Sequence, residues 1–229
     1  MHPLVYRLGF RVINVISRFK PAANGLTAIS RAWLRHATLR EMLAEQKFDG
    51  VIDGGANVGE FAAVVREVLP GSDLLCVEPQ PDCAAALRRQ GYRVVEAALW
   101  REKGTLTLSQ PTSETTSCTV LLATDTAAKA TWVVPSIALQ DLKISGERIL
   151  VKLDLQGAEP IALEGMGSLW ERCAGVLSEV TLGQGGTHEV LDRILGEHGF
   201  REFSTINQLQ LGGGRWEADK LWLRSPVRS

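Results

Sequence analysis

Short apolar segments alternate with amphipathic segments between residues 48 and 199. The apolar segments have the length of buried strands, and the amphipathic ones have helical periodicity and often end at glycine. The predicted strands are residues 48–53, 73–77, 93–97, 148–154 and 176–180. The predicted helices are residues 58–69, 81–90, 159–166 and 189–198. This alternation predicts βαβ units and a parallel sheet, and therefore a Rossmann-like α/β domain.

Two regions depart from the alternation. Residues 105–108 and 132–134 have strand character around a Ser/Thr-rich loop at 109–118, which predicts extra strands or a flap there. Segments 200–204 and 220–223 lie on either side of three glycines and predict a closing antiparallel ribbon. The sheet is therefore expected to be mostly parallel, with a late antiparallel strand.

The first 46 residues predict a helical extension, and residues 47–229 predict the Rossmann-like domain. Residues 4–19 place apolar side chains on one helical face with arginines elsewhere, and a second helix is predicted at 27–46. We favour packing of the first helix against the domain, as a lid or as a homodimer contact. Peripheral contact with a lipid surface is the alternative.

Composition and charge narrow the class of protein. The chain has 229 residues and a net charge of −1, which suits one domain and gives no electrostatic footprint for nucleic acid. Cys76, Cys83, Cys118 and Cys173 form no metal-binding pattern and predict buried thiols in a reducing compartment. No transmembrane span or signal peptide is predicted, so we expect a cytoplasmic protein.

The strongest local signal is the segment Asp53-Gly54-Gly55-Ala56-Asn57-Val58-Gly59, called the glycine turn below. It joins a predicted strand to a helix whose first N–H groups are free to meet a ligand. Glycine allows both a tight turn and close approach of that ligand. The next strand ends at Glu78-Pro79, about 20 residues on, where an acid can accept both hydroxyls of an adenosine ribose.

Two cofactor classes fit this pattern, because the glycine turn also resembles a dinucleotide-binding fingerprint. Asp53 favours one of them. A carboxylate closing the strand would repel a pyrophosphate but would suit a ligand with an ammonium group, such as S-adenosylmethionine. A nicotinamide-dependent oxidoreductase is the alternative. A turn that only packs helix on strand is disfavoured, because it would leave Asp53 and Glu78 as unpaired buried acids.

A second polar segment, Lys152-Leu153-Asp154-Leu155-Gln156-Gly157-Ala158-Glu159, follows a later strand. Strand alternation puts Lys152 and Asp154 on one face, at the edge of the sheet where α/β proteins bind ligands. We expect Asp154 and Glu159 at an acceptor site. The alternatives are an ion pair of Lys152 with Asp154 and an ordinary helix-start role for Glu159.

Methyl transfer to an alcohol needs a group that takes the proton of the acceptor. The candidates, in order, are Asp154, Glu159, Glu179 and His188. Glu179 ends the next strand, although it could instead pair with a helix, and His188 follows a glycine-rich loop, although it could be an ordinary surface histidine. Three of these acids could together hold Mg²⁺, but no metal is predicted.

Together these segments resemble the FkbM family of S-adenosylmethionine-dependent methyltransferases. The resemblance rests on the glycine turn, Glu78-Pro79, Ala97-Ala98-Leu99 with Gly104, and residues 152–159, and it covers residues 48 to 182. It implies a class I fold with a seven-stranded sheet, and O-methylation of sugars, glycolipids or polyketides. The family usually carries Glu where this chain has Gln156, which leaves a non-catalytic S-adenosylmethionine-binding module as an alternative.

The resemblance also implies which residues line the cofactor pocket, with Glu96 and Ala97 flanking the adenine. The predicted cofactor-binding residues are Asp53, Gly54, Gly55, Ala56, Asn57, Gly59, Glu78, Pro79, Glu96, Ala97 and Asp154. The expected reaction consumes S-adenosylmethionine, releases S-adenosylhomocysteine and methylates a hydroxyl of a small molecule.

Overall fold

The structure is a computed structural model that describes residues 37–110, 119–120, 130–183, 186–212 and 215–225. The predicted helix over residues 4–19, the first part of the helix predicted at 27–46, and Cys118 lie outside these ranges. Residues 37–44 of the second predicted helix are helical. No helix among the described residues is both long and apolar enough to cross a membrane.

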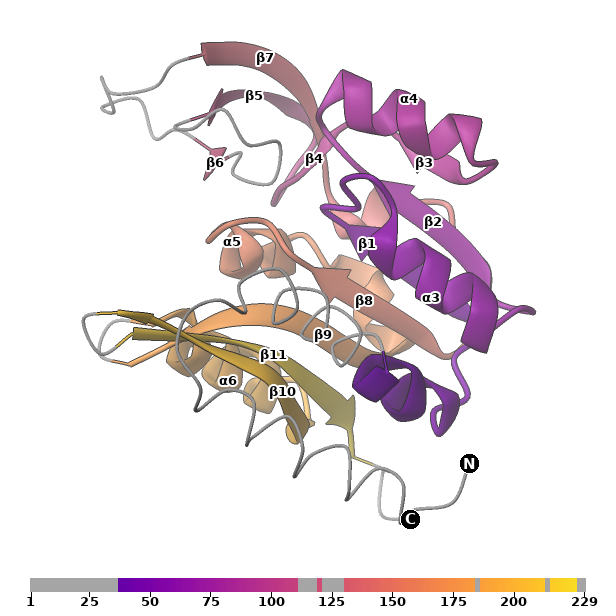
Figure 1. Cartoon of the computed structure of the whole chain (residues 1–229), viewed down its shortest axis with the longest axis vertical. Coiled ribbons are helices and arrows are strands. Elements are labelled where there is room, and N and C mark those ends of the chain that lie inside the picture. The colour runs from indigo at the N-terminus through magenta and orange to yellow at the C-terminus, as the bar shows by residue number, and fades with distance from the viewer. Residues whose placement is uncertain (1–36, 111–118, 121–129, 184–185, 213–214, 226–229) are drawn as a thin grey trace, which may run out of the picture.

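The centre of the fold is a seven-stranded sheet with the strand order β10-β11-β9-β8-β1-β2-β3 (Figure 1). Its strands are β1 (Gly50–Gly54), β2 (Asp73–Val77), β3 (Arg93–Val95), β8 (Ile149–Leu153), β9 (Cys173–Leu182), β10 (Phe200–Gly212) and β11 (Arg215–Arg224). Strands β3, β2, β1, β8 and β9 pair in parallel, whereas β11 is antiparallel to both β9 and β10. The mostly parallel sheet with a late antiparallel strand is confirmed.

Helices cover both faces of this sheet, as the continuous apolar strands require. The helix at 37–44, α3 (Glu60–Val68) and α4 (Pro81–Arg89) pack on one face. The short helices η1 (Leu139–Asp141) and η2 (Gly167–Glu171), with α5 (Glu159–Glu164) and α6 (Thr187–Glu197), pack on the other. Strand alternation decides the faces: Val51 of β1 belongs to the first layer, and Ile52 belongs to the second.

The predicted extra strands form a second sheet of four strands, in the order β4-β7-β5-β6. They are β4 (Ala98–Leu99), β5 (Gly104–Gln110), β6 (Thr119–Val120) and β7 (Ala130–Ile137). Strand β5 pairs antiparallel with β7, and Ala98, Leu108 and Val134 form a small apolar core. Residues 109 and 110 were expected in a loop but continue β5, because they pair with residues of β7.

Several boundaries also differ from the prediction. Strand β1 ends at Gly54 and not at Asp53, because Gly54 still pairs with both neighbouring strands. Helix α5 ends at Glu164, two residues before the predicted end, and Gly165 is its C-cap. The buried free thiols are confirmed for Cys76, Cys83 and Cys173.

Candidate active site

A pocket of about 520 Å³ opens where β1, β2 and β8 end, with the second sheet beside it. This volume is within the range of small-molecule sites. Residues 55–58 of the glycine turn, Glu78-Pro79 and Ala97–Leu99 line one part, and residues 154–156 with Glu179 line another. Strand β9 continues to Leu182 and lines the pocket with Leu177 and Glu179, so Glu179 does not end its strand as predicted. Leu39, Phe61 and Leu108 add apolar surface. The sequence-predicted candidates that reach the pocket are Gly55, Ala56, Asn57, Glu78, Pro79, Ala97, Asp154 and Glu179.

The glycine turn is held against both neighbouring strands. The backbone N–H groups of Gly55 and Ala56 donate to the carbonyl oxygen of Val77, at 2.9 and 3.3 Å. Gly55 has a φ of +70°, and a Cβ there would lie 2.1 Å from the carbonyl oxygen of Asp154. The turn therefore depends on glycine at this position, both for its left-handed backbone and for direct contact with the end of β8.

We expect Gly55→Ala to lower the free energy of unfolding by about 3 kcal/mol, since the methyl group meets backbone that cannot move aside. Gly91→Ala is a matched control: it has a φ of +79° but open space around it, so it should cost only about 1 kcal/mol. Urea unfolding of both variants measures the difference. Equal losses would show that close approach to β8 is unimportant.

Glu78 is fixed at the end of β2 with only 3% of its surface exposed. One carboxylate oxygen accepts a hydrogen bond from the backbone N–H of Asn57 at 2.8 Å, and the other accepts from the N–H of Gln80 at 2.9 Å. Burial raises the pKa of Glu78, and these two hydrogen bonds oppose the shift. The side chain is thus held in one orientation at the pocket wall, where its remaining lone pairs can accept hydroxyl groups.

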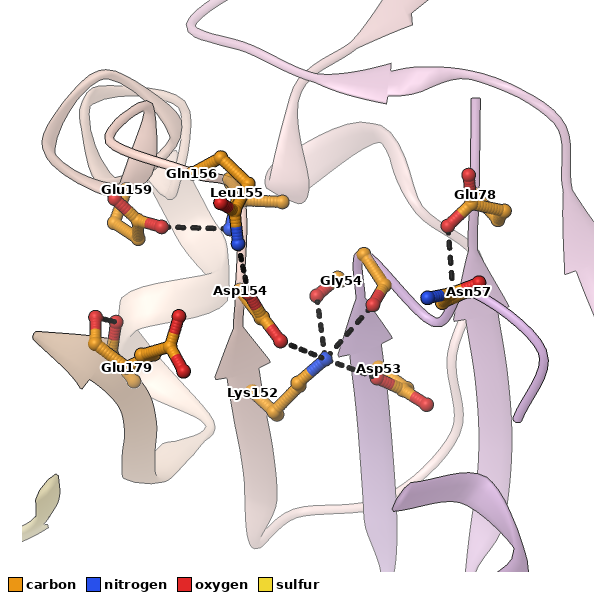
Figure 2. Close-up of polar contacts among 12 residues, drawn as sticks. Asp53, Gly54, Asn57, Glu78, Lys152, Asp154, Leu155, Gln156, Glu159 and Glu179 are labelled. Atoms are coloured by element: carbon orange, nitrogen blue, oxygen red, sulfur yellow. Dashed lines mark hydrogen bonds and ion pairs between the residues drawn. The ribbon is translucent and has the colours of Figure 1, made fainter. Parts of the chain in front are cut away.

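Asp53 and Lys152 form a buried ion pair beneath the glycine turn (Figure 2). Asp53 is completely buried and does not line the pocket, whereas Lys152 does, and its Nζ lies 3.1 Å from Asp53 Oδ1. Burial raises the pKa of Asp53 in spite of the lysine. Burial alone would lower the pKa of Lys152, but the carboxylates of Asp53 and Asp154 raise it. Lys152 therefore lies at the pocket wall, and Asp53 lies behind it as its buried counter-charge.

Asp154 stands at the carboxyl end of β8 and faces the pocket (Figure 2). Its Oδ1 accepts a hydrogen bond from Gln156 Nε2 at 3.0 Å, and its Oδ2 lies 3.7 Å from Lys152 Nζ. Its backbone N–H donates to the carbonyl oxygen of Gly54 at 3.1 Å. Gln156 therefore orients Asp154 by donating this hydrogen bond to it.

The other predicted site residues do not line the pocket. Glu159 accepts hydrogen bonds from the backbone N–H groups of Leu155 and Gly157, at 2.7 and 3.3 Å, and burial raises its pKa. The structure thus gives Glu159 the helix-start role that was the alternative interpretation.

His188 and Glu96 also have partners elsewhere. Nδ1 of His188 lies 3.1 Å from the carbonyl oxygen of Thr181, and Glu96 forms an ion pair with Arg88 at 2.6 Å. Gly54 and Gly59 are not among the residues that line the pocket. In the described part of the chain, no three acidic, histidine or cysteine side chains are arranged to hold a metal ion.

Sequence analysis missed two pocket residues on β11, Glu217 and Asp219. Asp219 is directly opposite Glu179 in the pairing of β9 with β11. Because β11 runs antiparallel, its first residues lie at the edge where the parallel strands end. The alternation Trp216-Glu217-Ala218-Asp219 could have revealed these acids if the direction of β11 had been applied to it.

The fold and the site are those of a class I S-adenosylmethionine-dependent methyltransferase. The defining features are the sheet order, the antiparallel strand β11 and the pocket at the ends of β1 and β2. A family model described as the methyltransferase FkbM domain matches residues 53–202. The chain belongs to this family. No curated protein sequence matches the chain.

Solved methyltransferase structures resemble the fold at low sequence identity. FkbM methyltransferase from Methylobacillus flagellatus KT is 14% identical, with a TM-score of 0.49, and the match covers 94% of this chain and 58% of that one. Magnesium protoporphyrin IX methyltransferase from Synechocystis PCC 6803, with bound S-adenosylmethionine, is 10% identical, with coverage of 95% and 90% and a TM-score of 0.47. An N1-methyltransferase from Burkholderia thailandensis is 13% identical, with coverage of 98% and 91% and a TM-score of 0.47.

Proposed function

We propose that this chain transfers the methyl group of S-adenosylmethionine to a hydroxyl oxygen of a small molecule, such as a sugar, a glycolipid or a secondary metabolite. The observation that carries the proposal is the continuity of the pocket. The same pocket is lined by Glu78 and the glycine turn, which suit the donor, and by Asp154 and Glu179, which suit a hydroxyl acceptor.

The residues of the pocket fit the donor in three places. The buried carboxylate of Glu78 can accept the ribose hydroxyls, and the free N–H groups at the start of α3 can meet a carboxylate. Ala97 and Leu99 offer apolar surface beside Glu78, where an adenine ring can lie.

In the proposed reaction the acceptor oxygen bonds to the methyl carbon while the carbon–sulfur bond breaks. The sulfur keeps the electron pair, and the products are a methyl ether and S-adenosylhomocysteine. The hydroxyl proton passes to Asp154, the carboxylate that faces the pocket at the end of β8. Alignment of oxygen, carbon and sulfur supplies much of the rate, so the protein acts chiefly by holding donor and acceptor in place.

The charge of the lining bears on the class of acceptor. Lys152 is the one cationic side chain on the wall among the described residues, and it lies against Asp53 and Asp154. The acidic residues of the wall are Glu60, Glu78, Asp154, Glu179, Glu217 and Asp219. An uncharged hydroxyl acceptor fits this wall better than one with a phosphate next to the reacting oxygen.

The test is incubation of the purified chain with methyl-deuterated S-adenosylmethionine and a panel of glycosides, each paired with its phosphorylated form. Mass spectrometry and NMR of the products should show a deuterated methyl ether on a neutral glycoside. Transfer to nitrogen or carbon would contradict O-methylation. Tight binding of S-adenosylhomocysteine without turnover on any acceptor would favour the non-catalytic module.

A further inference from the structure

The ammonium group of Lys152 occupies a position between the two parts of the pocket. It donates hydrogen bonds to the carbonyl oxygens of Gly54 and Gly55, at 3.2 and 2.9 Å. Its third near neighbour is Asp53 Oδ1 at 3.1 Å, and Asp154 Oδ2 follows at 3.7 Å. A single cation therefore contacts the glycine turn, the buried acid beneath it and the carboxylate at the end of β8 (Figure 2).

Asp53, the counter-charge of Lys152, has few other polar contacts. Asp53 is fully buried, and among the residues that the structure describes neither of its carboxylate oxygens has a hydrogen-bond partner, so the ion pair with Lys152 is its main polar contact. An isolated buried carboxylate is costly, as is an isolated buried ammonium group, so each of the two charges depends on the other. The side chain of Lys152 is itself only 12% exposed.

The two carbonyl groups that Lys152 binds, those of Gly54 and Gly55, belong to the backbone of the glycine turn. The carbonyl oxygen of Gly54 also accepts a hydrogen bond from the backbone N–H of Asp154. The N–H groups of Gly55 and Ala56 donate to the carbonyl oxygen of Val77. Without the lysine, the carbonyl of Gly55 loses its hydrogen bond and the peptide groups of the turn are freer to rotate. The N–H groups that open α3, which suit an anionic ligand, follow directly along the chain.

We propose that Lys152 is a positioning residue, which uses Asp53 as its buried counter-charge to fix the glycine turn relative to Asp154. Lys152 thereby sets the site for the amino-acid part of the donor, whereas the adenosine part depends on Glu78. The inference rests on donor binding in this pocket and not on the identity of the acceptor.

The test compares S-adenosylhomocysteine with adenosine, which lacks the amino-acid part, by calorimetric titration of three variants. Lys152→Met removes the cation, Lys152→Arg keeps the charge in a shape that does not match these oxygens, and Asp53→Asn/Lys152→Met removes both charges. We expect each folded variant to bind S-adenosylhomocysteine at least tenfold more weakly and adenosine within twofold of the parent chain. Lys103→Met, at an exposed lysine outside the pocket, should change neither affinity.

Thermal unfolding without ligand separates positioning from a purely structural role. The double variant should recover most of the stability that Lys152→Met loses, because no unpaired charge stays buried, but it should not recover affinity for S-adenosylhomocysteine. Parental affinity in any folded variant would overturn the proposal, as would failure of all three variants to fold. Neither titration uses an acceptor, so a failed search for a methyl ether would not affect this result.

Discussion

Glu78→Ala is expected to weaken the binding of S-adenosylhomocysteine by roughly a hundredfold. The variant removes two charge-assisted hydrogen bonds to the ribose, which together contribute about 3 kcal/mol. It also frees the backbone N–H groups of Asn57 and Gln80, which the carboxylate now holds at 2.8 and 2.9 Å. The loss of the ribose hydrogen bonds and the release of these two N–H groups should both weaken binding, because Asn57 and Gln80 also line the pocket.

Isothermal titration calorimetry measures the change directly, with Glu171→Ala as the control at an exposed acid outside the pocket. Affinity within threefold of the parent chain would show that Glu78 does not hold the ribose. The pH dependence supplies a second readout. The ionised carboxylate is the form that accepts both hydroxyls, and burial raises the pKa of Glu78. Affinity should therefore fall on acidification, starting at a higher pH than an ordinary glutamate would give, and Glu78→Gln should abolish this dependence.

Asp154→Asn is expected to lower the rate of methyl transfer by about a hundredfold or more, the usual range for loss of a general base. The amide retains the size of the carboxylate and can still accept the hydrogen bond from Gln156, so the site should keep its shape. What the variant loses is the capacity to take the hydroxyl proton. Binding of S-adenosylhomocysteine should change less than threefold.

Single-turnover measurements on the acceptor identified by the glycoside panel give the rate of the chemical step. Asp141→Asn, at an exposed position outside the pocket, is the control and should retain the full rate. A small effect of Asp154→Asn on the rate would show that another residue is the general base. Glu179→Gln and Asp219→Asn would then be compared, since both residues also line the pocket.

The architecture could be predicted because its signals are local. Strand β2 and helix α4 lie within one residue of their predicted bounds, since apolar runs ended by glycine, proline or charge define them. The glycine turn and Glu78 could be recognised for the same reason, as both follow directly from strand ends. The second sheet was foreseen only as extra strands, because the partner of a strand is a long-range choice that local alternation does not specify.

The ion pair of Lys152 with Asp154, at 3.7 Å, was among the alternatives, but the other partners of the charged residues could not be predicted. The place of Asp53 near a strand end predicted a ligand-facing acid, but Asp53 pairs with Lys152, which the register of β1 and β8 places opposite it. Glu159 was expected at the acceptor site, with a helix-start role as the alternative, and only the packed structure shows that it binds the backbone N–H groups of Leu155 and Gly157. Which carboxylates meet in one pocket depends on strand order, and thus on the whole fold.

A crystal structure of the chain with S-adenosylhomocysteine would show whether this pocket holds the methyl donor. We expect the ribose hydroxyls within hydrogen-bond distance of Glu78 and the amino-acid part over Gly55–Asn57, with the sulfur facing Asp154. Density for the ligand anywhere else, or a crystal soaked at saturating concentration in which this pocket stays empty, would contradict this expectation.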